Sequence, residues 1–460
     1  MLRLRILVNF LNLIKNKMPK HVTINKLIKP FNKKINVSGD KSLSIRWALL
    51  ASQAVGKSRA YNLLKSEDVI NTIKGLRKLG VKISIGKNFC EIDGVGINGF
   101  KYKKNLTINA GNSGTFGRLI LALLIKSPYK IKLTGDKSLS RRDFSRVIRP
   151  LKEFGANFYP EKKYKLPIYI KGTNFVRPIK YFEKKGSAQV KSCIMLAALN
   201  APGATKIKAK KSRNHTELLY KFLKLPIKVI NNKNDDLIEI NGYKKIYPFD
   251  YNIPSDISSS AFFIVLTLLS KKSYLTIKNV NVNSSRIGCI NILNKMGAKI
   301  ILKNKREYKG EKTADIHIKS KKYFKPINCP IKYNSKAIDE FLIIFLVAAK
   351  ANGISYFKDL AELNQKESPR LNLGSKILNM IGIKTKLTKK SIKIYGNPNL
   401  KLEKKFEIKN FFKDHRIMAL CTIAALTLGG KWKIHDPESI RTSFPSFFKI
   451  LKNDLGAKIK

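Results

Sequence analysis

A short phrase that recurs six times along the chain limits the possible folds more than any other feature. In five copies a glycine lies between apolar residues, and a polar and an apolar residue follow, as in KLGVKI and KMGAKI. A sixth, weaker copy, KLPIKV, has proline in place of the glycine. Such a regular period indicates an array of related structural units. The marker residues are Gly80, Gly155, Pro226, Gly297, Gly382 and Gly456, at intervals of 75, 71, 71, 85 and 74 residues.

Each copy is typical of a helix that ends at a glycine C-cap and leads into a strand. Upstream of each marker, by 39 to 43 residues, a second apolar helix opens in small polar residues. These openings lie at Lys41, Asn112, Ser187, Ser258, Asp339 and His415. We therefore predict an α/β fold of six units, each with two helices and several strands, and three units in each of two domains.

The predicted domain boundaries follow from junctions rich in glycine and proline near Ser38–Gly39 and near Asn252–Pro254. Repeats 1–3 form an inserted domain over residues 39–252. Residues 1–38 and 253–460 form a discontinuous domain, which holds a leader at about 1–18, then a first strand and repeats 4–6. Because two chain segments cross between the domains, we expect a hinged cleft.

The chain carries 92 lysine and arginine residues against 30 acidic ones, a formal net charge of +62. This charge raises a basic nucleic-acid-binding protein as an alternative from a different functional class. The basic residues are spread along the chain without a dense block, which favours a solvated lysine-rich surface instead. We therefore expect no nucleic-acid partner.

The first residues, MLRLRILVNFLNLIKNKM, combine a basic start with a short apolar run. The run is too short to span a bilayer, so the segment is a mis-called start, a disordered leader or a targeting segment. No later stretch is long and apolar enough to span a membrane, and no membrane association is expected. Five cysteines lie far apart without metal-ligand spacing, which predicts reduced core thiols and a cytoplasmic protein.

The helix openings carry side chains suited to anions. The N-terminus of a helix leaves backbone N–H groups unpaired and carries a partial positive charge, so anions bind there. In the first opening Arg46 follows Ser42 by four residues, which places both on one helical face beside Lys41. Ser42, Ser187 and Ser258 have an alternative structural interpretation as helix N-caps.

Further openings add donors of the same kind. In NAGNSGTFGRL the glycines allow close backbone approach to a phosphate or carboxylate, and Arg118 lies beside them, either for binding or as a structural residue. Lys366 and Arg370 are spaced four residues apart. Such a density of forked donors indicates small substrates with several phosphates and carboxylates. Other basic or amide candidates are Arg141, Arg142, Gln189, Lys191, His415 and Arg416.

The motifs in chain order resemble the 5-enolpyruvylshikimate-3-phosphate synthase family of enolpyruvyl transferases. They are GDKSLSIR, GNSGTFGRL, TGDKSLSRR, SAQVKS, SRNHTE, KAIDE, LNQKESPRL, DHRIMAL and TSFP, and the match runs from about residue 20 to residue 460. The resemblance implies two domains, each of three βαβαββ units about a pseudo-threefold axis. It also implies transfer of the enolpyruvyl group of phosphoenolpyruvate to the 5-hydroxyl of shikimate 3-phosphate, with release of phosphate, in the pathway to chorismate and the aromatic amino acids.

The resemblance further implies which residues bind each substrate. Those for shikimate 3-phosphate are Lys41, Ser42, Arg46, Ser187, Gln189, Asp339 and Lys366. Those for phosphoenolpyruvate are Lys41, Gly114, Arg142, Gln189, Arg370 and Arg416. No metal or organic cofactor is expected, and we expect a monomer whose partners are these two small anions.

The addition of an alcohol to an enol ether requires a base at the hydroxyl and an acid that protonates the methylene carbon. Asp339 is the candidate base. Glu367, Lys41 and His415 are the candidate proton carriers. The product then forms when a tetrahedral intermediate collapses, with the same groups acting in reverse.

Four positions depart from the usual family pattern. Asp143 and Phe144 follow Arg142, where the family has proline and methionine. Pro369 precedes Arg370, where the family usually has aspartate, which affects the expected pose of Arg370. Thr442, with Arg441 beside it, stands where some members have a lysine that binds phosphoenolpyruvate, so no role is assigned to either residue.

UDP-N-acetylglucosamine enolpyruvyl transferase is the nearest alternative, because it shares the architecture and the donor. That enzyme has a Lys-Asn pair where this chain has Lys41 and Ser42. It also has a loop cysteine in the region of TGDKSLSRRD, which contains none. These two differences favour shikimate 3-phosphate as the acceptor.

Overall fold

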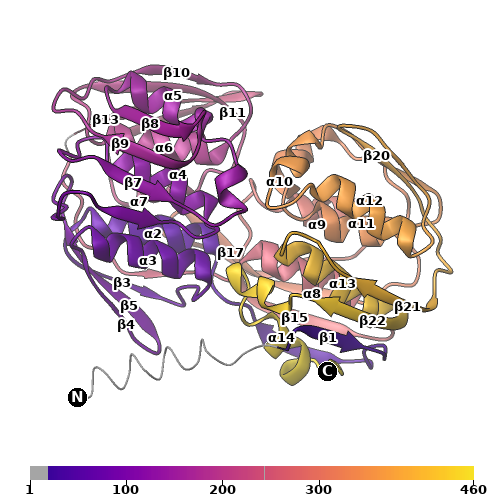
Figure 1. Ribbon diagram of the computed structural model, residues 1–460. Helices are drawn as coiled ribbons and strands as arrows, with labels where there is room; N and C mark the ends of the chain where they lie inside the picture. The colour runs from indigo at the N-terminus through magenta and orange to yellow at the C-terminus, as the bar shows by residue number, and fades with distance from the viewer. Residues whose placement is uncertain (1–18, 243) are drawn as a thin grey trace.

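The computed structural model describes residues 19–242 and 244–460, so the predicted leader at 1–18 lies outside the described residues. The chain folds into two lobes, indigo to magenta and orange to yellow in Figure 1. The buried hydrophobic residues form two clusters, one from Leu43 to Ile253, and one that joins Val22–Val37 to Ile257–Ile459. We call the corresponding parts the first lobe and the second lobe. The clusters support the predicted domain boundaries, which stay a prediction.

The first lobe holds three four-stranded sheets and the helices that cover them. Its strands are β3 (Val55–Tyr61), β4 (Lys82–Ile85), β5 (Phe89–Val95), β6 (Thr107–Asn109), β7 (Ile131–Thr134), β8 (Asn157–Lys162), β9 (Lys165–Lys171), β10 (Lys180–Glu183), β11 (Ala204–Lys210), β12 (Ile227–Asn231), β13 (Asp235–Asn241) and β14 (Tyr251–Asn252). Its helices are α2 (Lys41–Ser52), α3 (Glu67–Lys78), α4 (Gly114–Leu123), η1 (Leu139–Arg141), α5 (Ser145–Glu153), α6 (Ala188–Ala198) and α7 (His215–Phe222).

The second lobe holds one four-stranded and two three-stranded sheets. Its strands are β1 (His21–Ile24), β2 (Asn32–Asn36), β15 (Tyr274–Asn281), β16 (Ile301–Tyr308), β17 (Glu311–Lys319), β18 (Ile354–Phe357), β19 (Thr385–Leu387), β20 (Ile392–Tyr395), β21 (Leu402–Ile408) and β22 (Gly429–His435). Its helices are α8 (Ile257–Leu269), α9 (Gly288–Lys295), η2 (Ile331–Tyr333), α10 (Asn334–Ala337), α11 (Phe341–Ala349), η3 (Ala361–Gln365), α12 (Arg370–Met380), α13 (His415–Leu428), η4 (Pro437–Thr442), α14 (Phe447–Lys449) and η5 (Ile450–Asp454).

One topology repeats through both lobes. In the second unit β6 pairs with β7 in parallel, β7 pairs with β9 antiparallel, and β9 pairs with β8 antiparallel. With α4 and α5 between the strands, this order is βαβαββ, and the third unit follows it from β10 to β13. In the fifth unit isolated bridges of Phe324 and Asn328 take the place of the first strand. The predicted α/β fold of βαβαββ units, three in each lobe, is confirmed.

The two lobes exchange their first strands. β2 precedes α2 in the chain, yet it pairs in parallel with β15 of the second lobe. β14 precedes α8, yet it pairs in parallel with β3 of the first lobe. The backbone N–H of Asp40 also donates to the carbonyl of Pro254 at 2.8 Å, which ties the two crossing segments together.

The marker residues end helices as predicted, with one correction. Lys224, not Pro226, takes the left-handed conformation after α7, with φ +52°, because the helix ends two residues earlier than the phrase suggested. A lysine there occupies a conformation that glycine adopts without steric cost. The other five markers have positive φ: Gly80, Gly155, Gly297, Gly382 and Gly456.

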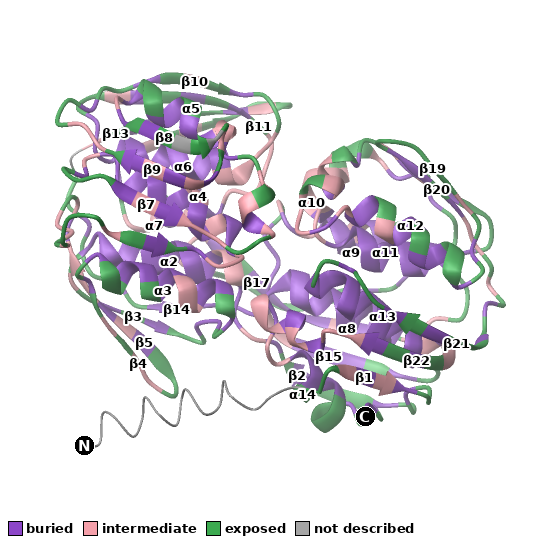
Figure 2. Cartoon of the chain, in the orientation of Figure 1, coloured by how far each residue is buried: buried purple, intermediate pink, exposed green. Residues whose placement is uncertain are grey.

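The inner helices bring their N-terminal ends toward the boundary between the lobes. α8, α11 and α13 pack against one another inside the second lobe, and α4 packs against α2 and α6 inside the first. All nine residues of α11 are buried, and Figure 2 shows these inner helices mainly in purple. Within the part of the chain that the structure describes, no helix combines the length and the apolar character needed to cross a membrane.

Candidate active site

Polar contacts join the lobes where the helix N-termini meet. Arg213 Nη2 of the first lobe lies 2.6 Å from Asp339 Oδ2 of the second, and Arg142 Nη1 lies 3.6 Å from Glu367 Oε1. Lys41 Nζ donates to Ser443 Oγ at 2.8 Å. These contacts gather charged groups from both lobes into one site.

Asp339, the predicted base, lies just before α11 among cations. Besides Arg213, its carboxylate lies 3.4 Å from Lys366 Nζ and 3.5 Å from Arg370 Nη1. Burial alone would raise the pKa of this carboxyl, but the positive charges of Lys366, Arg213 and Arg416 hold it well below its usual range. Asp339 is therefore ionised, as a base must be before it accepts a proton.

Glu367 forms a second ionised carboxylate beside the first. Its carboxylate contacts Arg370 Nη2 at 2.5 Å and, from the opposite lobe, Arg142. Burial would raise the pKa of Glu367, but Arg370 and Arg142 hold it well below the ordinary glutamate range. The carboxylate thus lies between two of the arginines predicted to bind phosphoenolpyruvate.

Three carboxylates hold Arg370 in place, those of Asp414, Glu367 and Asp339. Its Nε and Nη2 donate to both oxygens of Asp414, at 2.8 and 3.2 Å, and Asp414 also accepts from Ser368 Oγ at 2.7 Å. The Arg370 side chain is 2% exposed. This bidentate geometry places Arg370 firmly even though Pro369 stands where the family usually has an aspartate.

His415 is the first residue of α13 and is held neutral. Burial lowers the pKa of its imidazole to about 3. The negative charge of Asp414 opposes this shift, and the positive charge of Arg416 adds to it. Its Nδ1 lies 3.4 Å from Thr442 Oγ1, and its Nε2 is buried without a hydrogen-bond partner among the described residues. Arg416 donates through Nη1 to the carbonyl of Asp339 at 2.6 Å.

Lys41 connects the first helix opening to the other lobe. Its ammonium lies 2.9 Å from Asp68 Oδ2, in addition to its contact with Ser443. Burial raises the pKa of Asp68, and the charge of Lys41 opposes that shift. The Lys41 side chain is one-fifth exposed, so an incoming anion can approach it.

Arg46 lies one turn beyond Ser42 and is buried among neutral partners. It donates to Thr216 Oγ1 and to Ser192 Oγ, both at 2.9 Å, and to the carbonyl of Ser42 at 3.2 Å. Burial lowers the pKa of its guanidinium to about 10. Among the described residues no carboxylate forms an ion pair with it, so its charge is available to an anion.

The structure separates the serines by role. Ser187 is the N-cap of α6, and its Oγ accepts from the N–H of Val190 at 3.4 Å. Ser42 and Ser258 are not caps, because Asp40 caps α2 and Asp256 caps α8. Ser258 instead donates to Glu340 at 2.5 Å.

Gly114 begins α4 directly beneath two guanidinium groups. A Cβ at this position would lie 2.9 Å from Arg118 Nη1 and 3.0 Å from Arg142 Nη1, so a larger residue would displace them.

Arg118 donates to Gln189 Oε1 at 3.0 Å and to the carbonyl of Asp143 at 3.0 Å. The Cζ atom of its guanidinium lies 4.9 Å from the centroid of the Phe144 ring. Asp143 and Phe144, which depart from the family pattern, therefore orient Arg118.

Two sequence candidates do not take part. Arg141 is exposed at the end of η1. Lys191 is fully buried in an ion pair with Glu217 at 2.6 Å, so its role is structural. All residues predicted for the substrates lie where the lobes meet or on the first-lobe helices that lead to that boundary. Lys366 and Glu367 follow η3, and Ser42 lies one turn before Arg46 on α2.

The sequence interpretation missed three charged members of the site. Arg213 lies in the quoted SRNHTE motif, and Asp414 lies in DHRIMAL as the N-cap of α13, so both had a local signal. Asp68 had none, because its partner Lys41 is distant in sequence.

Among the described residues, His, Cys, Asp and Glu form no group that could hold a metal ion. The site thus gathers arginine and lysine side chains around two ionised carboxylates.

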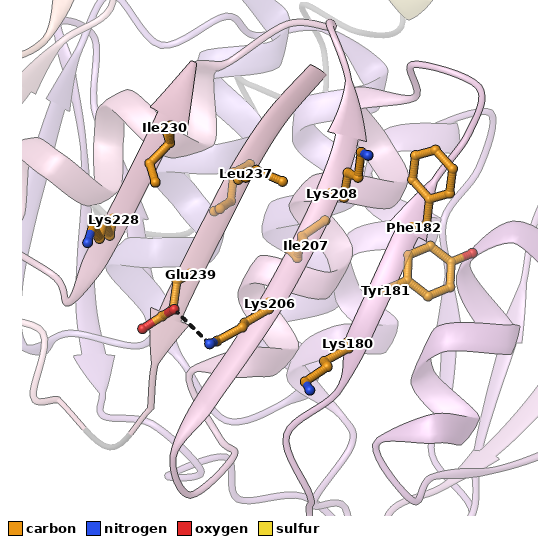
Figure 3. Close-up of a pocket in the computed structure, with 11 residues that line it drawn as sticks. Lys180, Tyr181, Phe182, Lys206, Ile207, Lys208, Lys228, Ile230, Leu237 and Glu239 are labelled. Atoms are coloured by element: carbon orange, nitrogen blue, oxygen red, sulfur yellow. Dashed lines mark ion pairs between the residues drawn. The ribbon is translucent and has the colours of Figure 1, made fainter. Parts of the chain in front are cut away.

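A separate hollow lies on the outer face of the sheet β10-β11-β13-β12. Figure 3 shows that the apolar residues Phe182, Ile230 and Leu237 line it together with lysines, two of which, Lys206 and Lys208, lie on the inner strand β11. It contains none of the site residues. The hollow therefore plays no part in the chemistry described above.

Comparisons with known proteins agree with this arrangement. A family model described as EPSP synthase (3-phosphoshikimate 1-carboxyvinyltransferase) matches residues 26–451. A 3-phosphoshikimate 1-carboxyvinyltransferase of Ruthia magnifica subsp. Calyptogena magnifica is 39% identical over 94% of this chain and 98% of that protein. A similar relative from Zymomonas mobilis is 35% identical over 94% of this chain and 95% of its own length.

Two solved structures are similar in fold. An EPSP synthase from Acinetobacter baumannii has a TM-score of 0.83 and 34% sequence identity, covering 96% of this chain and 99% of that one. The enolpyruvyl transferase NikO from Streptomyces tendae has a TM-score of 0.75 at 14% identity, covering 96% of this chain and 98% of that one. At that identity the second structure supports the fold alone.

Proposed function

The chain belongs to the EPSP synthase (3-phosphoshikimate 1-carboxyvinyltransferase) family, and from that membership we propose how its site residues carry out the reaction. The enzyme transfers the enolpyruvyl group of phosphoenolpyruvate to the 5-hydroxyl of shikimate 3-phosphate and releases phosphate, in the shikimate pathway. The observation that carries the assignment of roles is the position of Asp339 and Glu367, two ionised carboxylates that guanidinium groups of both lobes surround.

Shikimate 3-phosphate binds mainly to the first lobe. Arg46 supplies a buried guanidinium with no carboxylate in an ion pair among the described residues, and Ser187 supplies a hydroxyl at the N-terminus of α6. A phosphate there gains the partial positive charge of the helix end together with the full charge of the arginine. Ser42, Gln189 and Lys41 line the same side, while Asp339 and Lys366 address the ring hydroxyls from the second lobe.

Phosphoenolpyruvate binds between the lobes. Arg142 of the first lobe and Arg370 of the second both contact Glu367, so they lie on either side of one small volume. Arg416 and Lys41 add charge from α13 and α2, and the glycine at position 114 leaves room beneath Arg142. Forked guanidinium donors suit the carboxylate and phosphate of this substrate.

Binding of the two anions adjusts the proton chemistry. In the free enzyme the cations hold the pKa values of Asp339 and Glu367 well below the ordinary range, so both are weak bases. Added phosphate and carboxylate groups neutralise these cations, which raises both pKa values. Asp339 then becomes basic enough to accept the proton of the 5-hydroxyl, and Glu367 can carry a proton to the methylene carbon.

Lys41 is the second candidate proton carrier, since its side chain remains partly exposed. His415 contributes differently. With a pKa of about 3 it is neutral at physiological pH, so it acts as a hydrogen-bonding group rather than as an imidazolium acid. The arginines then stabilise the charge of the tetrahedral intermediate before phosphate leaves, which is a preorganised electrostatic contribution.

We also propose that the protein is a monomeric cytoplasmic enzyme. The site is assembled from both lobes of a single chain, so a second copy is not needed to complete it. All five cysteines are buried and unpaired, which fits a reducing compartment.

A coupled assay tests the acceptor. Purified enzyme is mixed with phosphoenolpyruvate and either shikimate 3-phosphate or UDP-N-acetylglucosamine, and released phosphate is measured. We expect release with shikimate 3-phosphate alone. Release only with the nucleotide sugar would overturn the assignment, and salt-sensitive RNA binding without phosphate release would support the nucleic-acid alternative instead.

A further inference from the structure

We infer that Pro369 is a positioning residue, which fixes the turn between Glu367 and Arg370 and so holds the phosphoenolpyruvate side of the site in its binding geometry. This inference rests on the proposed function. It concerns the one residue of KESPR that has no side-chain polar group and that departs from the family pattern.

The backbone at Pro369 is an inverse γ-turn. Its φ is −71° and its ψ is 73°, close to the values of such a turn, and the N–H of Arg370 donates to the carbonyl of Ser368 at 2.8 Å. The pyrrolidine ring restricts φ to about −65°, so proline is already in the required conformation before folding. Its missing N–H costs nothing, because the turn uses the N–H of the following residue.

The residues on either side of this turn all reach into the site. Glu367 contacts Arg142 and Arg370, while Ser368 and Arg370 share the carboxylate of Asp414. The carbonyl of Pro369 then accepts from the N–H of Leu373 at 2.9 Å, which begins α12. A sharp turn of fixed φ therefore sets the direction of Glu367 and Arg370 relative to each other.

Without the ring, the loop would gain freedom at the point where these contacts converge. Pro369→Ala and Pro369→Gly release φ progressively, because glycine has the larger range of allowed conformations. We expect KM for phosphoenolpyruvate to rise about two- to fivefold in Pro369→Ala and further in Pro369→Gly. KM for shikimate 3-phosphate should rise less than KM for phosphoenolpyruvate, because its phosphate-binding residues Arg46 and Ser187 lie in the other lobe and only Lys366 lies beside the turn.

Pro398→Ala is the matched control. Pro398 lies in a partly exposed loop of the same lobe, after β20 and away from the site, so this variant frees a proline φ without touching KESPR. Steady-state kinetics with both substrates, and the urea midpoint of unfolding, are measured for all variants. A rise in KM specific to phosphoenolpyruvate, absent from Pro398→Ala, supports the inference. Kinetics equal to the control, or a parallel rise in both KM values with a lowered midpoint, would overturn it.

A second measurement does not depend on turnover. Hydrogen exchange of the Arg370 and Leu373 amides in the unliganded enzyme should be faster in Pro369→Ala than in the wild type or in Pro398→Ala. Unchanged exchange would contradict the turn-fixing role even if the kinetics differ. Failure of the proposed function is distinguishable, because then the wild type itself releases no phosphate from the two substrates.

Discussion

Arg213 and Asp339 face each other across the boundary between the lobes, with Nη2 and Oδ2 2.6 Å apart. The first lobe thus controls the ionisation of a group that belongs to the second. The predicted base is tuned by an arginine that comes from the loop before α7, and its charge depends on how the lobes meet.

Arg213→Ala should raise the pKa of Asp339, because it removes one of the cations that lower it. Asp339 would then be protonated at a higher pH, so the acid limb of the pH profile of kcat/KM should move upward by about one pH unit. Arg213→Lys, which keeps the charge, should restore most of the limb. Arg59→Ala removes an exposed ion pair with Glu91 and serves as the control. An acid limb that stays in place in Arg213→Ala would contradict this electrostatic role.

Asp339→Ala should abolish the base, with a loss in kcat of about 10²- to 10⁴-fold. Isothermal titration with shikimate 3-phosphate checks that the variant still binds its substrate. Asp93→Ala, on β5 of the first lobe, is the control for loss of a remote carboxylate. Turnover at the wild-type rate in Asp339→Ala would remove Asp339 from its proposed role.

Arg46→Lys keeps the charge but loses the forked donor that reaches Thr216 and Ser192. We expect KM for shikimate 3-phosphate to rise about 10- to 100-fold, the effect of one or two lost hydrogen bonds to a charged group. KM for phosphoenolpyruvate should stay within about twofold. Steady-state kinetics with each substrate in turn measure the two KM values, and Arg77→Lys, on the exposed side of α3, is the control. Equal rises for both substrates would argue against a phosphate-specific contact.

Arg146 and Glu362 form another contact between the lobes, with Nη2 and Oε1 3.0 Å apart. The pair is partly exposed, so Glu362→Gln should raise both KM values only about two- to threefold and leave kcat unchanged.

Small-angle scattering should show compaction of the wild type when shikimate 3-phosphate and a phosphoenolpyruvate analogue bind, since the substrate anions draw cations of both lobes together. Glu161→Gln breaks an exposed pair on an outer sheet and should change neither measurement. No compaction in the wild type would contradict substrate-driven closure.

Glu311 accepts from His215 across the lobes at 2.6 Å and from Asn281 and Asn283. Burial would raise the pKa of Glu311, but these partners lower it below its ordinary value of 4.5. The charged form therefore stabilises the fold above that pH, and the contribution is lost as the pH falls through the lower folded pKa.

Glu311→Gln should accordingly reduce the free energy of unfolding by about 2 to 4 kcal/mol at pH 7. The difference from the wild type should shrink as the pH falls below the ordinary glutamate range. Urea denaturation at several pH values measures it, with Glu307→Gln on the exposed side of β16 as control. A difference that does not change with pH would show that shape, not charge, is what the position requires.

Local patterns predicted most of the fold and many of the site residues. The glycine markers and the helix openings are short-range features, so the six units and the residues at the helix starts could be identified from spacing. Lys224 escaped this procedure because a lysine in the left-handed conformation has no sequence signal, whereas Pro226 nearby resembled a marker. Ser187 is the N-cap of its helix, as one of the two interpretations of the sequence had it. The other two serines, Ser42 and Ser258, are not caps, because Asp40 and Asp256 cap those helices.

Contacts between residues distant in the sequence were beyond such reasoning. Arg213 meets Asp339, and Asp68 meets Lys41, only because the chain folds back over long sequence distances. The charge of each residue is visible in the sequence, but its partner is not. The depressed pKa of Asp339, which arises from cations distant in the sequence, could not be read from local spacing either.

The exchange of β2 and β14 also sets an order in which the molecule can be completed during synthesis. Once it leaves the ribosome, β2 must remain unpaired until β15 has been made, and β1 must wait for β22 near the other end of the chain. The sheet of β3 likewise lacks its outer strand until residues 251–252 appear. Because domains ordinarily fold as they emerge, this chain carries two early strands that wait for late partners: β2 until translation has passed residue 281, and β1 until it has passed residue 435.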